Sequence, residues 1–407
     1  MQYQKGLKII NDPIYGFITV PDQLIARIID HPYFQRLRRI TQMGCAHVVF
    51  PGARHSRFEH ALGCLHLMQK AIRVLRLKGI TISDHEEQAL QIGILLHDIG
   101  HGPYSHTLES ALIKSASHEE LGLKFLESLN KEFDGELDLA IRLFSGNYHR
   151  KFLNQLIASQ LDIDRLDYLK RDSFYAGVAE GNINSERIIS MFNVHDDELV
   201  VDAKGIYSVE NFLIARRLMY WQAYMHKTCV SAEIMLRHVL DRASELVNET
   251  PSIASGNLKK FLRSESDQQT DDELLKNFAE LDDVDIIYHI KKWSENDDPV
   301  LSQLSQGFMK RNLLKIVISN EKAARSKISE LEDRLVNKLG IAEHEVGYFI
   351  SQGKLTNIAY KSDVQPIKIR FKDGNLKEVA EASDQLNLKA LTHPVDKYYY
   401  CYPKVIN

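Results

Sequence analysis

Residues Ile92 to His106 read IGILLHDIGHGPYSH, and the rest of the chain is interpreted outward from this stretch. An apolar run leads to the adjacent pair His97 and Asp98, and His101 and His106 follow within nine residues. Imidazoles and carboxylates bind divalent metal ions and carry protons. Because the preceding run predicts a buried helix, this group of side chains indicates a metal-binding catalytic site rather than packing.

Two further segments carry the same residue types. The loop FPGARHSRFEH, residues 50–60, leads into a predicted helix over 58–77 with His60 in its first turn. In LDIDRLDYLKRD, residues 161–172, Asp164, Tyr168 and Asp172 recur every four residues and share one helix face. Alone, His60 fits a core histidine and the acidic face fits a salt-bridged surface helix. Because the flanks of all three segments are apolar, we favour their convergence on one site.

A second pair, His195 and Asp196, is a control for this interpretation. It lies in a polar stretch before a predicted strand, without other ligand types in helical register. A chain with this many His and Asp residues contains about one such pair by chance. The dipeptide alone is therefore weak evidence, and the neighbouring ligand types are what indicate a metal site at His97. If the helix continues, His101 lies one turn beyond His97 on the same helix face.

The predicted fold class is mostly α, with a helical core, short β-hairpins and a small C-terminal α+β lobe. Residues 7–20 predict a hairpin, Asp84 is expected to cap a helix that runs to the His97 pair, and 33–42 predict a helix whose arginines form a solvated basic face. Residues 195–208 alternate like strands around a turn at Lys204–Gly205, and 209–248 predict one long buried helix. We expect a catalytic domain over 1–250, a helical extension over 251–310, and a regulatory or oligomerising lobe over 311–407.

Composition narrows the functional classes. The chain has 407 residues, 44% of them hydrophobic, with a net charge of -4, which disfavours nucleic acid as the main partner. Its N-terminus lacks a signal peptide and no segment is long and apolar enough to span a membrane, so we expect a cytoplasmic protein. The cysteines show no paired spacing and are expected to be reduced thiols; they are Cys45, Cys64, Cys229 and Cys401.

These segments resemble the pattern of the HD superfamily of phosphohydrolases, in which an H, an HD pair and a D recur. More narrowly, the chain resembles the deoxynucleoside triphosphate (dNTP) triphosphohydrolases, including the animal members with an added sterile-alpha-motif domain. The match runs from KIINDPIYG through DHPYFQRLRRITQMG and ARRLMYWQAYMHK to KRNLLK, residues 8–315. It implies an HD-domain helical core and a metal-dependent phosphohydrolase.

The resemblance also implies roles for individual residues. The metal ligands would be His60, His97, Asp98 and Asp164, holding one divalent ion for which Mn, Fe, Ni, Zn and Mg remain open. The catalytic residues would be His101, His106, Glu109 and His118, with His106 the general acid and Glu109 orienting its ring. An Asp takes the place of Glu109 in the animal members, so the reach of this carboxylate changes.

Contacts to a nucleotide follow from the same resemblance. Arg57, Arg165 and Arg216 would face the phosphates, although Arg165 replaces the Lys of the animal enzymes. Gln42 and Asp172 would meet the 3′ hydroxyl, with Tyr168 and Tyr224 against the 2′ carbon and Met43 in place of a Leu. Such a pocket would reject ribonucleotides by steric clash.

The expected function is hydrolysis of dNTPs to deoxynucleoside and triphosphate. Alternatives are an HD phosphohydrolase for nucleoside monophosphates or phosphodiesters, and a nucleotide-sensing protein with little turnover. The resemblance also suggests a homo-oligomer and an activating nucleotide, bound through residues that serve equally well to cap and bridge the N-terminal helices; these are Asn11, Asp30, Gln35 and Arg38.

Overall fold

The computed structural model describes residues 8–113, 116–263, 270–384 and 388–406, and the side chains of His106 and Ser110 lie outside this described part. The N-terminal hairpin is confirmed: β1 (Ile9–Asp12) pairs antiparallel with β2 (Gly16–Thr19). Asp12 accepts the N–H groups of Ile14 at 2.8 Å and Tyr15 at 2.9 Å, and Gly16 adopts φ 74°. A short acidic side chain and a glycine therefore close the turn.

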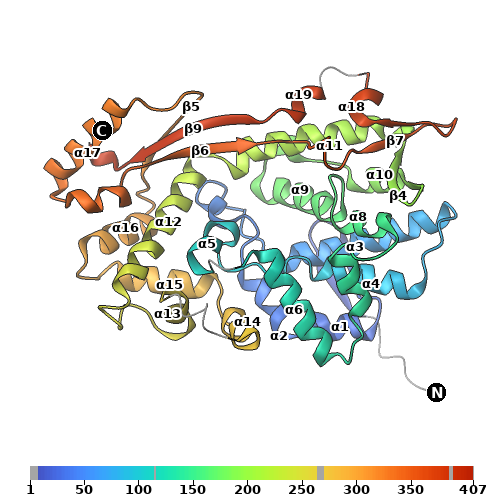
Figure 1. Ribbon diagram of the computed structural model, residues 1–407, viewed down its shortest axis with the longest axis horizontal. Helices are drawn as coiled ribbons and strands as arrows, with labels where there is room; N and C mark the ends of the chain where they lie inside the picture. Colours follow the sequence, from blue (N-terminus) through green and yellow to red (C-terminus); the bar gives the residue numbers. More distant parts are fainter. Residues whose placement is uncertain (1–7, 114–115, 264–269, 385–387, 407) are drawn as a thin grey trace.

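Three helices pack together and position the candidate site; they lie in the right half of Figure 1. The long helix α3 (Arg57–Leu77) packs against both α4 (Asp84–Leu95) and α9 (Ile163–Ala176). Helix α3 begins with a capping box at Ser56, and Asp162 caps α9. The cap of α4 is Ser83, in a capping box with Glu86, and not Asp84 as expected, because Asp84 is already the first helical residue. Because the starts of α3 and α9 meet the end of α4, ligand types from three distant segments converge.

The helix α4 ends at Leu95, so the helical register assumed for His97 and His101 does not apply. The chain turns over 97–100 instead. A Cβ on Gly100 would lie 2.0 Å from the carbonyl oxygen of His118, at the start of α6 (His118–Glu132). This close backbone approach takes the chain out of the helix while keeping His101 beside Asp98.

The prediction of one long helix over 209–248 is wrong. The structure has α11 (Ile206–Met219), a π-helical turn η6 (Tyr220–Tyr224) and α12 (Lys227–Leu246). The ring of His226 accepts the N–H of Thr228 at 3.2 Å and starts the new helix. Since both helices are buried, apolar periodicity alone carries no sign of the break.

The second hairpin is also corrected. β3 (Phe192–His195) pairs with β4 (Glu198–Asp202), and the turn lies at Asp196 and Asp197, whose φ values are 48° and 59°. The predicted turn residues Lys204 and Gly205 belong to η5 (Ala203–Gly205), which leads into α11. The control pair of His195 and Asp196 is thus a strand end and a turn.

The C-terminal segment is α+β, as expected. β5 (Lys315–Ser319), β9 (Val395–Tyr402) and β6 (Ser351–Asn357) form an antiparallel sheet in that order, beside α17 (Arg325–Leu339) (Figure 1). β7 (Lys368–Arg370) instead joins β4 in parallel and β8 (Leu376–Glu378) antiparallel. The C-terminal chain therefore completes a sheet begun near residue 192, and the proposed domain boundaries stay a prediction.

The remaining elements are α1 (Gln23–Asp30), α2 (Pro32–Gln35), η1 (Arg36–Arg39), η2 (Gly44–Val48), η3 (Ser105–Thr107), α5 (Glu109–Leu112), α7 (Asp138–Phe144), α8 (Lys151–Ile157), η4 (Ala179–Gly181), α10 (Ser185–Ser190), α13 (Gly256–Leu262), α14 (Asp271–Ala279), α15 (Asp283–Trp293), α16 (Pro299–Met309), η8 (Glu343–Tyr348), α18 (Val379–Ala382), α19 (Lys389–Thr392) and η9 (Lys404–Ile406). The fold is mostly α with small sheets, as predicted. Within the described residues, no helix has the length and apolar character needed to cross a membrane, and all four cysteines are buried and free.

Candidate active site

The four predicted metal ligands lie together. The Nε2 atom of His60 is 3.2 Å from Nε2 of His97, 3.1 Å from Oδ1 of Asp164 and 3.7 Å from Oδ2 of Asp98. The Nε2 atom of His97 is 3.4 Å from carboxylate oxygens of both Asp98 and Asp164. Two imidazoles and two carboxylates from three segments thus share one small volume.

Hydrogen bonds on the far side of each ring define which nitrogen faces the cluster. Nδ1 of His60 donates to Oδ2 of Asp167 at 2.8 Å, and Nδ1 of His97 donates to the carbonyl oxygen of Ile94 at 2.6 Å. Both Nε2 atoms are then lone-pair acceptors, 3.2 Å apart. Two such lone pairs beside two carboxylates repel one another unless a cation lies between them, so the donor set fits a divalent metal ion.

Charge in the cluster points the same way. Burial lowers the pKa of His97, but Asp98 and Asp164 outweigh it and raise that pKa above its ordinary value. Burial raises the pKa of Asp164, yet the imidazoles of His60 and His97 beside it hold that pKa well below its usual range. The carboxylates therefore stay ionised and available to a cation.

Cys64 is a neighbour that sequence reasoning missed. Its Sγ atom lies 3.6 Å and 3.7 Å from the two ring nitrogens of His60, one helical turn away. With His60, His97 and Asp164 it forms a group whose potential ligand atoms lie within 4.8 Å of one another. Burial raises the pKa of the Cys64 thiol, so we favour the ionised Asp98 over the protonated thiol as the fourth ligand.

A buried ionic network supports His60 from behind. Asp167 accepts from Nε of Arg171 at 2.8 Å and from Nη2 at 3.1 Å, and Nη1 of Arg171 reaches Asp12 at 2.8 Å. A Cβ at Gly63 would lie 2.1 Å from Asp167 and 2.2 Å from Arg171, so α3 needs a glycine where this pair passes. The network orients the imidazole and increases the basicity of its metal-facing nitrogen.

Arg36 shows that the expected solvated basic face is wrong at this position. The residue is 1% exposed, and its guanidinium donates to the carbonyl oxygens of Ile99 at 2.8 Å and His101 at 3.0 and 2.8 Å. Burial lowers the pKa of Arg36 to about 10. This arginine therefore fixes the loop that carries His101.

A cavity of about 370 Å³ adjoins the cluster, and this volume is within the range of small-molecule sites. Its lining contains all eight predicted substrate contacts, which are Gln42, Met43, Arg57, Arg165, Tyr168, Asp172, Arg216 and Tyr224. Asp98, Asp164, His101 and His118 also line it. Further lining residues that sequence reasoning missed include Tyr104, Ser105, Tyr220 and Glu233.

Two of the predicted catalytic residues, His101 and His118, line the cavity. The rings of His101 and His118 stack at 4.1 Å between centroids, and Oε1 of Glu109 accepts from Nδ1 of His118 at 2.9 Å. The backbone of His106 lies in η3, but its side chain is outside the described residues, so its pairing with Glu109 stays a prediction. Burial and Arg57 lower the pKa of His101, which keeps this imidazole neutral.

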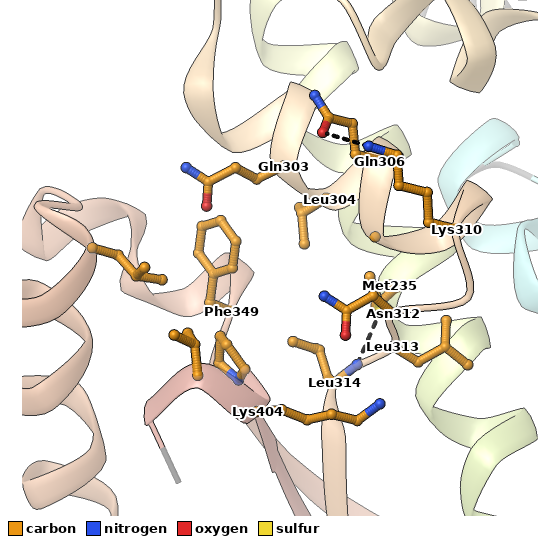
Figure 2. A pocket seen from close by; sticks show the side chains of 14 residues that line it. Met235, Gln303, Leu304, Gln306, Lys310, Asn312, Leu313, Leu314, Phe349 and Lys404 are labelled. Carbon is orange, nitrogen blue, oxygen red and sulfur yellow. Dashed lines mark hydrogen bonds between the residues drawn. The ribbon is translucent and has the colours of Figure 1, made fainter.

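A second cavity of about 400 Å³ lies between α12, α16 and the C-terminal lobe. Figure 2 shows Leu304, Leu314 and Phe349 extending into it, with Lys310 and Lys404 at its margin. None of its described lining residues is His, Cys, Asp or Glu. The two cavities have similar volumes, so volume does not identify the active site. The first cavity is the candidate because, in the described part of the chain, only it of these two is lined by metal-ligating side chains.

The residues expected to bind an activating nucleotide bridge the N-terminal elements. Nε2 of Gln35 donates to the carbonyl oxygen of Ile29 at 2.7 Å, and Nε of Arg38 donates to Gln35 at 2.9 Å. Asp30 pairs with Lys8 at 2.5 Å on the exposed surface. Asn11 lies in β1. These contacts fit the alternative in which the residues cap and bridge the N-terminal helices, and activation by a nucleotide stays a prediction.

Comparison with known proteins agrees with this geometry. The HD domain matches residues 57–172, and the HD-associated region matches residues 183–347. The uncharacterized protein YwfO of Bacillus subtilis is 30% identical over 390 residues, covering 92% of this chain and 88% of that protein. The deoxynucleoside triphosphate triphosphohydrolase SAMHD1 homolog of Dictyostelium discoideum is 30% identical over 388 residues, which cover 90% of this chain and 70% of that protein.

Among solved structures, a phosphohydrolase from Bacteroides thetaiotaomicron is 49% identical, with a TM-score of 0.94 over 98% of this chain and 100% of that chain. The HD match begins at the residue that opens α3 and ends at Asp172, so it encloses the converging segments described above. The likeness thus covers the candidate site as well as the fold. The chain belongs to the HD-domain phosphohydrolases, in the family that includes the SAMHD1 deoxynucleoside triphosphate triphosphohydrolases.

Proposed function

We propose that the protein hydrolyses dNTPs to deoxynucleoside and tripolyphosphate. One observation carries the proposal: a single cavity combines the carboxylates of the metal-ligand cluster, three arginines, and an aspartate held between a histidine and a tyrosine. These parts match the α-phosphate, the rest of the triphosphate chain and the sugar of a deoxynucleotide. The SAMHD1 relatives, by their name, act on this substrate class.

The arginines supply positive charge in a protein with net charge -4. Nε of Arg57 donates to Oγ of Ser105 at 2.9 Å, and its Nη1 pairs with Asp98. The Nε groups of Arg165 and Arg216 are buried and have no hydrogen-bond partner among the described residues. Leaving such groups unpaired is costly, and phosphate oxygens would satisfy them.

The residues expected to contact the sugar hold one another in place. Oδ1 of Asp172 pairs with Nε2 of His55 at 2.7 Å, and Oδ2 accepts from the Tyr224 hydroxyl at 2.7 Å. The rings of Tyr168 and Tyr224 meet edge to face, 6.4 Å between centroids. Asp172 retains lone pairs for a 3′ hydroxyl, while two fixed aromatic rings leave little room for a 2′ hydroxyl.

The reaction forms a bond from a water oxygen to the α-phosphorus and breaks the bond from that phosphorus to the 5′ oxygen. A divalent ion held by His60, His97, Asp98 and Asp164 would activate the water and neutralise phosphate charge. The arginines hold the triphosphate in line with the attack. We assign the proton that reaches the departing 5′ oxygen to His106, with His118 and Glu109 in the same relay.

Incubation of metal-loaded protein with a dNTP panel, followed by chromatography of the products, tests the proposal. Deoxynucleoside and tripolyphosphate are the expected products, whereas release of orthophosphate or pyrophosphate would overturn it. Turnover of 5′-monophosphates alone would favour another phosphohydrolase activity. Tight calorimetric binding of dNTPs without hydrolysis would favour a nucleotide sensor.

A further inference from the structure

Glu233 is a carboxylate in the cavity that the proposed reaction does not use. It lies on α12, one turn after Cys229, and both residues line the cavity. A Cβ on Gly44 would have three oxygens close by: the Tyr104 carbonyl at 3.6 Å, the Thr107 hydroxyl at 3.7 Å and Oε1 of Glu233 at 3.9 Å. Gly44 adopts φ 50°, a conformation that favours glycine, so the space in front of Glu233 stays open.

This carboxylate has no partner in the described part of the chain. No hydrogen bond or ion pair to Glu233 is present there, and burial alone raises its pKa to about 7. The titratable groups that face it are the thiols of Cys45 and Cys229, whose own pKa values burial and Glu233 raise. No described cation forms an ion pair with it, so this carboxylate suits neutral hydrogen-bond donors rather than phosphate.

The cavity therefore contains two chemically different groups of side chains. Arg57, Arg165 and Arg216 suit the phosphates, whereas Glu233 and two other oxygens suit a group rich in N–H donors. In a nucleotide the group rich in neutral N–H donors is the base. We propose that Glu233 contacts the Watson–Crick edge of the base and selects guanine, an inference that rests on the proposed function.

Hydrogen-bond complementarity gives the choice of base. Guanine presents two adjacent donors, N1–H and the N2 amino group, which match the two oxygens of an ionised carboxylate. Adenine and cytosine offer one donor beside an acceptor, and thymine offers one donor between two carbonyl oxygens. Each of these would place an acceptor lone pair against the Glu233 carboxylate, a repulsive contact that favours guanine.

The test compares kcat/KM for dGTP, dITP, dATP, dCTP and dTTP at pH 8.5. For the native protein we expect dGTP to exceed dATP by about 5- to 150-fold, the range for one bidentate base contact. Inosine lacks the N2 amino group, so dITP is expected between dGTP and dATP. Equal kcat/KM for all five would overturn the inference while leaving the proposed function intact.

Glu233→Gln removes the charge and gives a side chain with one donor and one acceptor, which matches adenine. This variant should lose dGTP turnover and narrow or invert the ratio of dGTP to dATP. Glu245→Gln, on the solvent side of the same helix, is the matched control and should keep the native ratio. An equal loss with all five substrates in Glu233→Gln would instead indicate a structural role and refute base selection.

Two further measurements separate the possible failures. The native ratio of dGTP to dATP should fall as pH decreases from 8.5 to 6, because protonated Glu233 becomes a donor and an acceptor; a constant ratio would contradict the inference. If no dNTP is hydrolysed, calorimetric titration with dGTP and dATP replaces turnover. A guanine preference in binding would then support base selection although the proposed function fails, and its absence would overturn both.

Discussion

Replacing Asp167 with Asn is expected to weaken metal binding without removing any metal ligand. Asp167 is fully buried and accepts the Nδ1 proton of His60 at 2.8 Å, which keeps Nε2 of that ring deprotonated and directed at the cluster. An amide keeps the shape but loses the charge that makes Nε2 more basic. Loss of such support lowers metal affinity about 10- to 100-fold, or about 1.4–2.7 kcal/mol.

The same substitution also affects stability, which a matched control separates from metal binding. Arg171 is fully buried and divides its hydrogen bonds between Asp167 and Asp12. Removing either carboxylate leaves the guanidinium with one counter-charge, at a cost of about 3 kcal/mol, the lower end for a broken buried ion pair. Asp12→Asn should therefore lose comparable stability while retaining metal affinity, because Asp12 makes no contact with His60.

The assay removes metal with a chelator and titrates each variant with Mn²⁺ by calorimetry, alongside urea unfolding. We expect weaker binding in Asp167→Asn alone and similar midpoints of unfolding in both variants. An equal fall in metal affinity in the two variants would show that loss of folding, not loss of support for His60, is the cause. Unchanged affinity in a folded Asp167→Asn protein would refute the role assigned to this carboxylate.

Three other predictions follow from the same contacts. His97→Ala should abolish metal content and turnover, whereas His195→Ala, in the strand end of the second hairpin, should keep both; elemental analysis and the dNTP assay compare them. Asp283→Ala removes the acceptors for Thr41 N–H at 2.9 Å and Tyr104 N–H at 2.7 Å, so about 2–4 kcal/mol of stability and part of kcat should be lost. Asp283→Asn should recover only part of this loss, because its one amide oxygen replaces one of the two accepting oxygens. Arg150 and Ser83 outweigh burial and lower the pKa of Glu86 from 4.5 to about 2. Above pH 4.5 the free energy of unfolding should therefore be about 2 kcal/mol higher with ionised Glu86 than in Glu86→Gln, and this difference should disappear as the pH falls towards 2. Urea unfolding of both proteins between pH 4.5 and 2 measures it.

Local sequence patterns predicted much of the fold. Caps, glycines and apolar spacing were enough to predict the first hairpin and α3, because those signals act within a few residues of the chain. The break between α11 and α12 was missed since it depends on the ring of His226 capping a new helix between two buried ones. The second turn was placed wrongly because Lys204–Gly205 has turn composition, while Asp196 and Asp197 adopt positive φ under the pairing of β3 with β4.

For the site, the sequence alone indicated the residue types and the three segments expected to carry the chemistry: His60, the His97–Asp98 pair and an acidic residue within 161–172, which the resemblance to the HD superfamily narrows to Asp164. Tertiary structure decided what surrounds them. The hydrogen bond from Asp167, the burial of Arg36 and the open carboxylate of Glu233 all depend on partners distant in the chain. Charge, protonation and hydrogen-bond satisfaction are properties of a three-dimensional environment, and no local pattern encodes them.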